Sequence, residues 1–149
     1  MYKHKRLLVA TDGSELSKKA VSSAIGLAAA IGAELVALYV VPHYPTSYFE
    51  GGIAISMDDV SRTEKKWAED GQAIVHEVEQ TAAARGVSAK GITVRSGLVA
   101  ESILNTAKKH DCDLVVMASH GRKGIQRVLL GSETQQVLTH SAIPVLVLR

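Results

Sequence analysis

Short apolar segments recur along the chain and alternate with segments whose apolar residues follow helical spacing. The apolar segments are RLLVAT (6–11), AELVALYVV (33–41), KGITVRS (90–96), DLVVMAS (113–119) and PVLVLR (144–149). They are rich in leucine and β-branched residues and lack regular apolar–polar alternation, which is typical of strands buried on both faces. We therefore predict a strand in each of them.

The segments between these strands predict helices, because in the first three of them the apolar residues lie three, four or seven positions apart. The apolar positions are Leu16, Ala20, Ala24, Leu27 and Ile31, then Val60, Trp67, Ile74, Val78 and Ala82, then Val99, Ile103 and Ala107, and finally Val137 with Leu138. Alternating strands and helices joined by right-handed crossovers predict an α/β fold: a doubly wound parallel sheet of five strands with helices on both faces. A length of 149 residues is typical of a single domain, here 1–149.

Three loops that follow strands are candidates for the ligand site, because ligands of such sheets bind at the carboxyl ends of the strands where the winding reverses. The loop 42–57 after the second predicted strand is unusually long, which suggests a lid, a contact surface or a mobile region. Asp12-Gly13-Ser14 follows the first predicted strand, and the stretch SHGRKGIQRVLLGS (119–132) follows the fourth. Asp12 has an alternative interpretation as the cap of the first helix, since aspartate is common at that position.

The glycines Gly121 and Gly131 indicate turns in which backbone N–H groups can converge on an anion. A helix that begins at Ser132 would add free N–H groups and the positive end of its dipole. The alternative is that both glycines serve only as turns and that Ser132-Glu133-Thr134-Gln135 forms a capping box. Neither the P-loop pattern nor a G-x-G-x-x-G after the first strand is present.

Three segments taken in order resemble the universal stress protein family: VATDGSELSKKAV (9–21), LVVMASHGRKGIQRVLLGSETQQVL (114–138) and IPVLVLR (143–149). The resemblance covers essentially the whole chain. It implies a parallel sheet with strand order 3-2-1-4-5, so that the winding reverses between strands one and four.

The ATP-binding branch of that family carries a glycine motif, which this chain matches except at one position. The motif is Gly, two residues, Gly, nine residues, Gly and then Ser or Thr. Gly121, the nine residues 122–130, Gly131 and Ser132 fit it, whereas Ala118 replaces the first glycine. Because residue 118 ends a strand, where φ is normally negative, we expect the added methyl group to shift the ligand without closing the crevice.

The resemblance implies that this chain binds ATP, with Mg²⁺ carried by the phosphates more than by protein ligands. Asp12, with Thr11 beside it, resembles the residue that faces the adenosine, and Val40 resembles the residue whose backbone meets the adenine edge. The phosphate-binding wall and turns correspond to Met117, Ala118, Ser119, His120, Gly121, Arg122, Gly131, Ser132 and Thr134.

Composition narrows the function classes further. A net charge of +2 without a basic stripe argues against nucleic-acid binding, and no apolar run approaches the roughly 20 residues that span a bilayer. The single cysteine, Cys112, forms no internal disulfide, and the five apolar residues after MYKHKR are too few for a secretory signal. We therefore expect a cytoplasmic protein.

The predicted function is a stress-response protein that binds ATP or a related adenine nucleotide and acts through conformation or assembly. No catalytic residue and no metal-ligand cluster is predicted. The last strand (144–149) is apolar and would be an edge, and family members pair it with its copy in a homodimer. The alternatives are a dimeric interaction module that binds no nucleotide and a slow ATP hydrolase or phosphotransferase.

Overall fold

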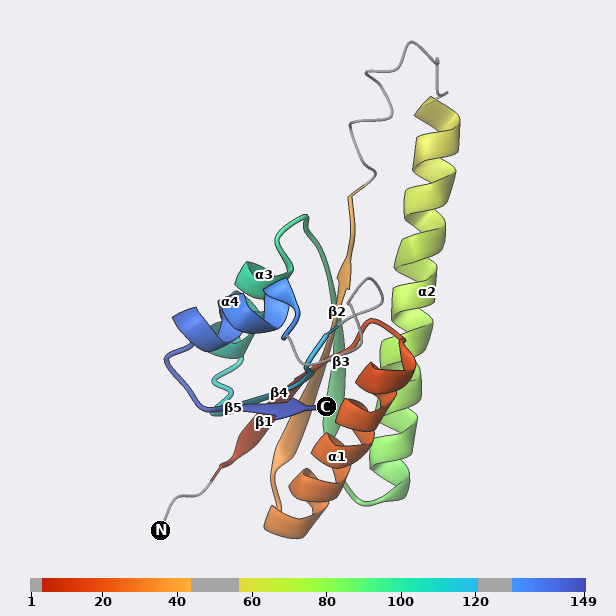
Figure 1. The fold of residues 1–149 in the computed structure, drawn as a ribbon. Helices are drawn as coiled ribbons and strands as arrows, with labels where there is room; N and C mark the ends of the chain where they lie inside the picture. Colours follow the sequence, from red (N-terminus) through yellow and green to blue (C-terminus); the bar gives the residue numbers. More distant parts are fainter. Residues whose placement is uncertain (1–3, 44–56, 121–129) are drawn as a thin grey trace.

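The computed structural model describes residues 4–43, 57–120 and 130–149. Strands and helices alternate strictly along these residues (Figure 1). In chain order they are β1 (Arg6–Ala10), α1 (Glu15–Ile31), β2 (Glu34–Val41), α2 (Met57–Ala84), β3 (Ala89–Arg95), α3 (Val99–Lys109), β4 (Leu114–Ala118), α4 (Ser132–His140) and β5 (Val145–Leu148). All five predicted strands are confirmed, with ends that differ by at most one residue from the predicted ranges.

The five strands form one parallel sheet in the order β3-β2-β1-β4-β5. This confirms both the doubly wound class and the strand order. Strand β1 is central: Leu8 pairs with Val36 of β2 on one side and with Val115 of β4 on the other. The chain winds from β1 toward β3 and then returns to β4 and β5, so its direction reverses between β1 and β4.

Two apolar cores lie on opposite faces of the sheet, because successive side chains of a strand point to opposite sides. Leu7 and Val9 pack with α1 and α2, whereas Leu8 packs with α3 and α4. Figure 1 shows the same division, with α1 and α2 on one side of the sheet and α3 and α4 on the other. Burial on both faces explains why the strands read as continuous apolar runs.

Helix α1 has clear signals at both ends. The Ser14 side chain accepts a hydrogen bond from the Ser17 N–H at 3.2 Å and caps the first turn. Gly32 has φ of 71°, and its N–H bonds to the Ala28 carbonyl, which ends the helix in a left-handed turn. The predicted apolar face of α1 is correct at Ala20 and Ala24.

Helix α2 packs closely on β2 and β3 through small residues. A Cβ added at Gly71 would lie 2.5 Å from Cδ1 of Tyr39, a buried side chain of β2. A Cβ at Gly91 of β3 would lie 2.8 Å from Val75 of α2. These glycines therefore set the distance between helix and sheet. Within the described residues, no helix is long and apolar enough to cross a membrane.

Replacing Gly71 with alanine tests this close approach. We expect G71A to lower the free energy of unfolding by about 1–3 kcal/mol, because the new methyl group must displace the buried Tyr39 ring. Gly26 of α1 is the matched control, since its Cβ would meet only Arg85 Nη1 at 3.7 Å. G26A should leave stability unchanged or raise it by up to about 1 kcal/mol. Urea denaturation measures both, and equal stability of G71A and the unsubstituted protein would contradict this packing.

Candidate functional site

The carboxyl end of β1 leads directly into a tight turn before α1. The Thr11 N–H continues the ladder to the Leu38 carbonyl of β2 at 2.9 Å. The Thr11 side chain is buried, and its hydroxyl lies 3.1 Å from the Ser17 hydroxyl of α1. Thr11 therefore joins the strand to the helix that follows it.

Asp12 shapes the turn and is not the helix cap. One of its carboxylate oxygens accepts a hydrogen bond from the Ser14 N–H at 2.9 Å, while Gly13 takes a φ of 80°. The capping residue is Ser14, so the interpretation of Asp12 as the cap of α1 is wrong. Asp12 is half-buried, two residues beyond the end of β1, the strand that pairs with β4.

Met117 and Val40 lie on the same face of the sheet, near the carboxyl ends of their strands. Met117 is buried in the core beneath α3 and α4, and Val40 packs against that core while staying half-buried. Strand β4 ends beside β5, where the Ser119 N–H bonds to the Leu148 carbonyl at 2.7 Å. The structure thus brings β1, β2 and β4 residues predicted from the sequence to one edge of the sheet.

Ala118 has ordinary strand geometry. Among the described residues, the only residue other than glycine with positive φ is Asp111, which confirms the expected backbone at position 118. Alternation along β4 places the Ala118 methyl group on the same face as Val116, the α1 side. Met117, on the α3 and α4 side, has the opposite orientation.

Gly131 brings the start of α4 against the end of β4. Its N–H donates to the Ser119 carbonyl at 2.7 Å. A Cβ at this position would lie 3.1 Å from His120 Cα and 3.2 Å from the Ser119 carbonyl oxygen. Because Gly131 has φ of −61°, glycine is needed here for the close approach of two backbones and not for a left-handed conformation.

Helix α4 begins without a side-chain cap. Gly131 is the capping residue and Ser132 is the first helical residue, so the predicted capping box with Ser132 as its cap does not form. The Gln135 side chain donates to the Leu130 carbonyl at 2.8 Å instead of reaching back to a cap. A helix start without a side-chain cap presents amide hydrogens and a positive dipole end, which suit an anion.

Thr134 fastens this helix start to β4. Its hydroxyl donates to the carbonyl of Ala118 at 2.9 Å and shares the proton with that of Ser119 at 3.1 Å. Thr134 is 1% exposed. Its hydroxyl therefore holds the first turn of α4 in place. Thr134 was predicted to be one of the phosphate-binding residues, and in the structure its hydroxyl contacts two other members of that set, Ala118 and Ser119.

Glu133 points from α4 toward a second helix start. Its carboxylate accepts a hydrogen bond from the Ala100 N–H at 3.0 Å, in the first turn of α3. The residue before α3, Leu98, supplies no side-chain cap, so a carboxylate from another helix takes that role. This contact has no local signal in the sequence, because it joins residues 33 positions apart.

The remaining predicted positions differ in what the structure says of them. His120 is half-buried, with its Nδ1 atom 3.1 Å from the Ser119 hydroxyl. Gly121 and Arg122 lie outside the described residues.

Among the residues that are described, no group of three or more His, Cys, Asp and Glu side chains is placed to hold a metal ion. Burial raises the pKa of the Cys112 thiol to about 11, so it is protonated at neutral pH.

Comparison with known proteins identifies relatives along the whole chain. The model of the universal stress protein family matches residues 3–149. Universal stress protein MJ0531 from Methanocaldococcus jannaschii is 35% identical over 147 residues, which are 98% of this chain and 82% of that protein. The solved universal stress protein UspA from Lactobacillus plantarum is 26% identical, with a TM-score of 0.83 and complete coverage of both chains.

Solved relatives include complexes with adenine nucleotides. One is a universal stress protein in complex with cAMP, 25% identical to this chain, with a TM-score of 0.71 and 99% coverage of both chains. The observed strand order, β3-β2-β1-β4-β5, is the one expected from the resemblance to this family, whose model matches residues 3–149. This chain belongs to the universal stress protein family.

Proposed function

We propose that this protein binds an adenine nucleotide, ATP in the first place, at the carboxyl ends of β1 and β4. The observation that supports this proposal is the contact between the end of β4 and the start of α4. Gly131 and Thr134 hold the uncapped start of α4 against Ala118 and Ser119, where the winding of the sheet reverses. A helix start fixed at this position is a site for phosphate.

Each predicted residue takes a role that follows from its place. The base would lie against the half-buried Val40, on the same face of the sheet as the buried Met117, and Asp12 would lie near the ribose. The amide of Ser132 would meet the phosphates, while Gly131, whose N–H is bonded to the Ser119 carbonyl, and Thr134 are positioning residues. The sequence adds Gly121 and Arg122 to the phosphate-binding set, and Mg²⁺ would be carried by the phosphates.

The related structure with cAMP supports an adenine nucleotide over another anion. ATP is favoured by the glycine motif, because two turns that present amides on either side of one crevice suit a chain of phosphates. Ala118 does not argue against this ligand, since its backbone needs no positive φ and its methyl group lies on the α1 side of β4.

We propose binding, not turnover, as the role of this site, in a cytoplasmic protein that acts through conformation or assembly. The described groups that resemble catalytic ones have structural partners. An Asp12 carboxylate oxygen accepts the Ser14 N–H, and the His120 Nδ1 atom lies within hydrogen-bond distance of the Ser119 hydroxyl. Neither arrangement provides a base aimed at a water molecule in line with a phosphate.

Assembly is proposed through the edge strand β5. Its apolar residues are only partly buried, and Leu146 is 41% exposed. An apolar edge strand offers unpaired backbone groups to a second copy, and a two-fold contact between identical strands closes on itself. We therefore propose a homodimer formed by the segment 144–149.

Substitution of Gly131 tests the nucleotide site. We expect G131V to abolish Mg-ATP binding in isothermal titration calorimetry, because the side chain would push the start of α4 away from Ser119 and His120. A118G is the matched variant in the same motif, and its affinity should change by less than about tenfold, or about 1.4 kcal/mol. Thermal melting shows whether G131V is folded. A folded G131V with normal affinity, or an unsubstituted protein that binds no Mg-ATP, would refute the site.

A charge on the edge strand tests the dimer. L146E should convert a dimer into a monomer in analytical ultracentrifugation, since two carboxylates would meet across the two-fold axis. L138E is the control, because Leu138 is equally exposed at 41% but belongs to α4. Dimers of L146E as tight as those of the unsubstituted protein would show that β5 is not the interface.

A further inference from the structure

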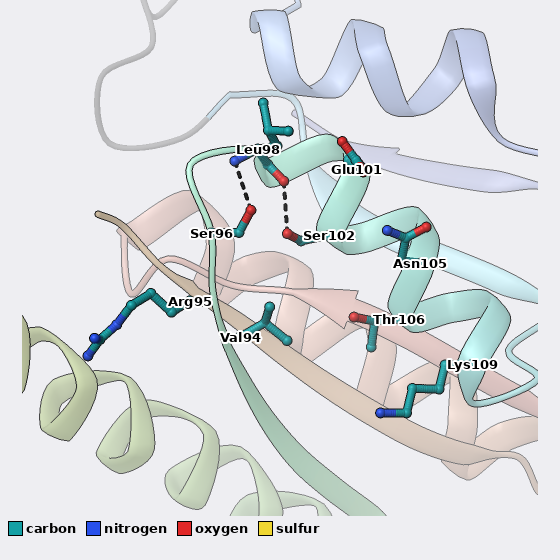
Figure 2. A pocket seen from close by; sticks show the side chains of 9 residues that line it. All are labelled: Val94, Arg95, Ser96, Leu98, Glu101, Ser102, Asn105, Thr106 and Lys109. Carbon is teal, nitrogen blue, oxygen red and sulfur yellow. Dashed lines mark hydrogen bonds between the residues drawn. The ribbon is translucent and has the colours of Figure 1, made fainter. Parts of the chain in front are cut away.

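A cavity of about 330 Å³ lies between the end of β3 and one face of α3. Figure 2 shows the side chains that line it, and it shares no residue with the proposed nucleotide site. The lining residues are Val94, Arg95, Ser96, Leu98, Glu101, Ser102, Asn105, Thr106 and Lys109. The cavity is open to solvent, because five of its nine lining residues are exposed, and its volume is at the lower end of that of small-molecule sites, so the expected occupant is no larger than a metabolite.

Three of the polar lining groups are engaged in holding the fold. The Ser96 hydroxyl accepts the Leu98 N–H at 3.0 Å, and the Ser102 hydroxyl donates to the Leu98 carbonyl at 2.8 Å. The Arg95 guanidinium extends away toward α2 (Figure 2), where it pairs with Glu64 at 3.2 Å. These groups shape the cavity and are not its binding groups.

The groups that remain belong to α3. Among the described residues, Asn105, Thr106 and Lys109 make no side-chain hydrogen bond. Glu101, Asn105 and Lys109 are four residues apart and form one row along the helix. At about 1.5 Å per residue, the Cα atoms of Glu101 and Lys109 are roughly 12 Å apart along the helix, with Asn105 between them.

The two ends of the cavity therefore differ in charge. Glu101 is near the start of α3, beside the exposed Leu98 side chain. Lys109 ends the helix and supplies the positive charge at the other end of the cavity.

We propose that this cavity binds a small amphipathic monocarboxylate. The carboxylate would pair with the Lys109 ammonium group, and Asn105 and Thr106 offer an amide and a hydroxyl beside it. The apolar part would lie on Val94 and Leu98. The other end of the cavity carries the Glu101 carboxylate and, among the described residues, no unpaired cation, so the lining offers one partner for a single negative charge and favours a monocarboxylate over a di- or triphosphate.

Titration of the full chain with sodium hexanoate, followed by two-dimensional amide NMR, tests this proposal. We expect saturable shifts confined to residues 94–109, at least fivefold weaker binding in K109A, and no comparable shifts with hexylammonium. K108A is the matched control: Lys108 is also exposed in the last turn of α3 but does not line the cavity. Its affinity for hexanoate should match that of the unsubstituted protein.

Three results would overturn the proposal. One is the absence of saturable shifts, and another is an equal loss in K108A and K109A, which would indicate attraction to positive charge in general. The third is a set of shifts centred on Thr11, Met117 and Gly131, which would place hexanoate in the nucleotide crevice. None of these results depends on whether the protein binds ATP, because the cavity and the crevice have no lining residue in common.

Discussion

The carbonyl of Ser119 is the point on which the proposed site depends. It accepts two hydrogen bonds, from the Gly131 N–H at 2.7 Å and from the Thr134 hydroxyl at 3.1 Å. A buried carbonyl without partners would cost free energy, so these bonds satisfy the end of β4 and place α4 at the same time. The orientation of the first amides of α4 follows from this contact.

This contact also explains where glycine and threonine are required. Gly131 lets the start of α4 approach the backbone of Ser119 and His120 closely. A Cβ at this position would lie 3.1 Å from His120 Cα, which is tighter than an ordinary van der Waals contact. Thr134 supplies the hydroxyl that reaches both Ala118 and Ser119 from inside the helix. The first turn of α4 is fixed before any ligand arrives, and a preorganised set of donors loses less entropy on binding.

The strands and their order could be predicted from the sequence, whereas the structural roles of several single residues could not. Continuous apolar runs indicated the strands because both faces of the sheet are buried, while the strand order came from the family resemblance. Gly131 was predicted as a turn residue, whereas its value lies in close packing at a negative φ. Neither the contact of Glu133 with Ala100 nor that of Gly71 with Tyr39 has a local signal, since each joins distant segments.

Helix α3 links the two proposed sites. Its first turn is capped by Glu133, which is next to Ser132 in α4, and the row from Glu101 to Lys109 lines the cavity. On the sheet, Val94 of the cavity pairs directly with Val40 of the crevice.

A ligand that moves α3 relative to β3 would therefore change the position of the Ala100 N–H and, through Glu133, act on the start of α4. Such coupling is reciprocal by thermodynamic necessity, so nucleotide binding would change the affinity of the cavity by the same factor. Its size depends on how far α3 moves, because a ligand that leaves α3 in place has no differential interaction to transmit.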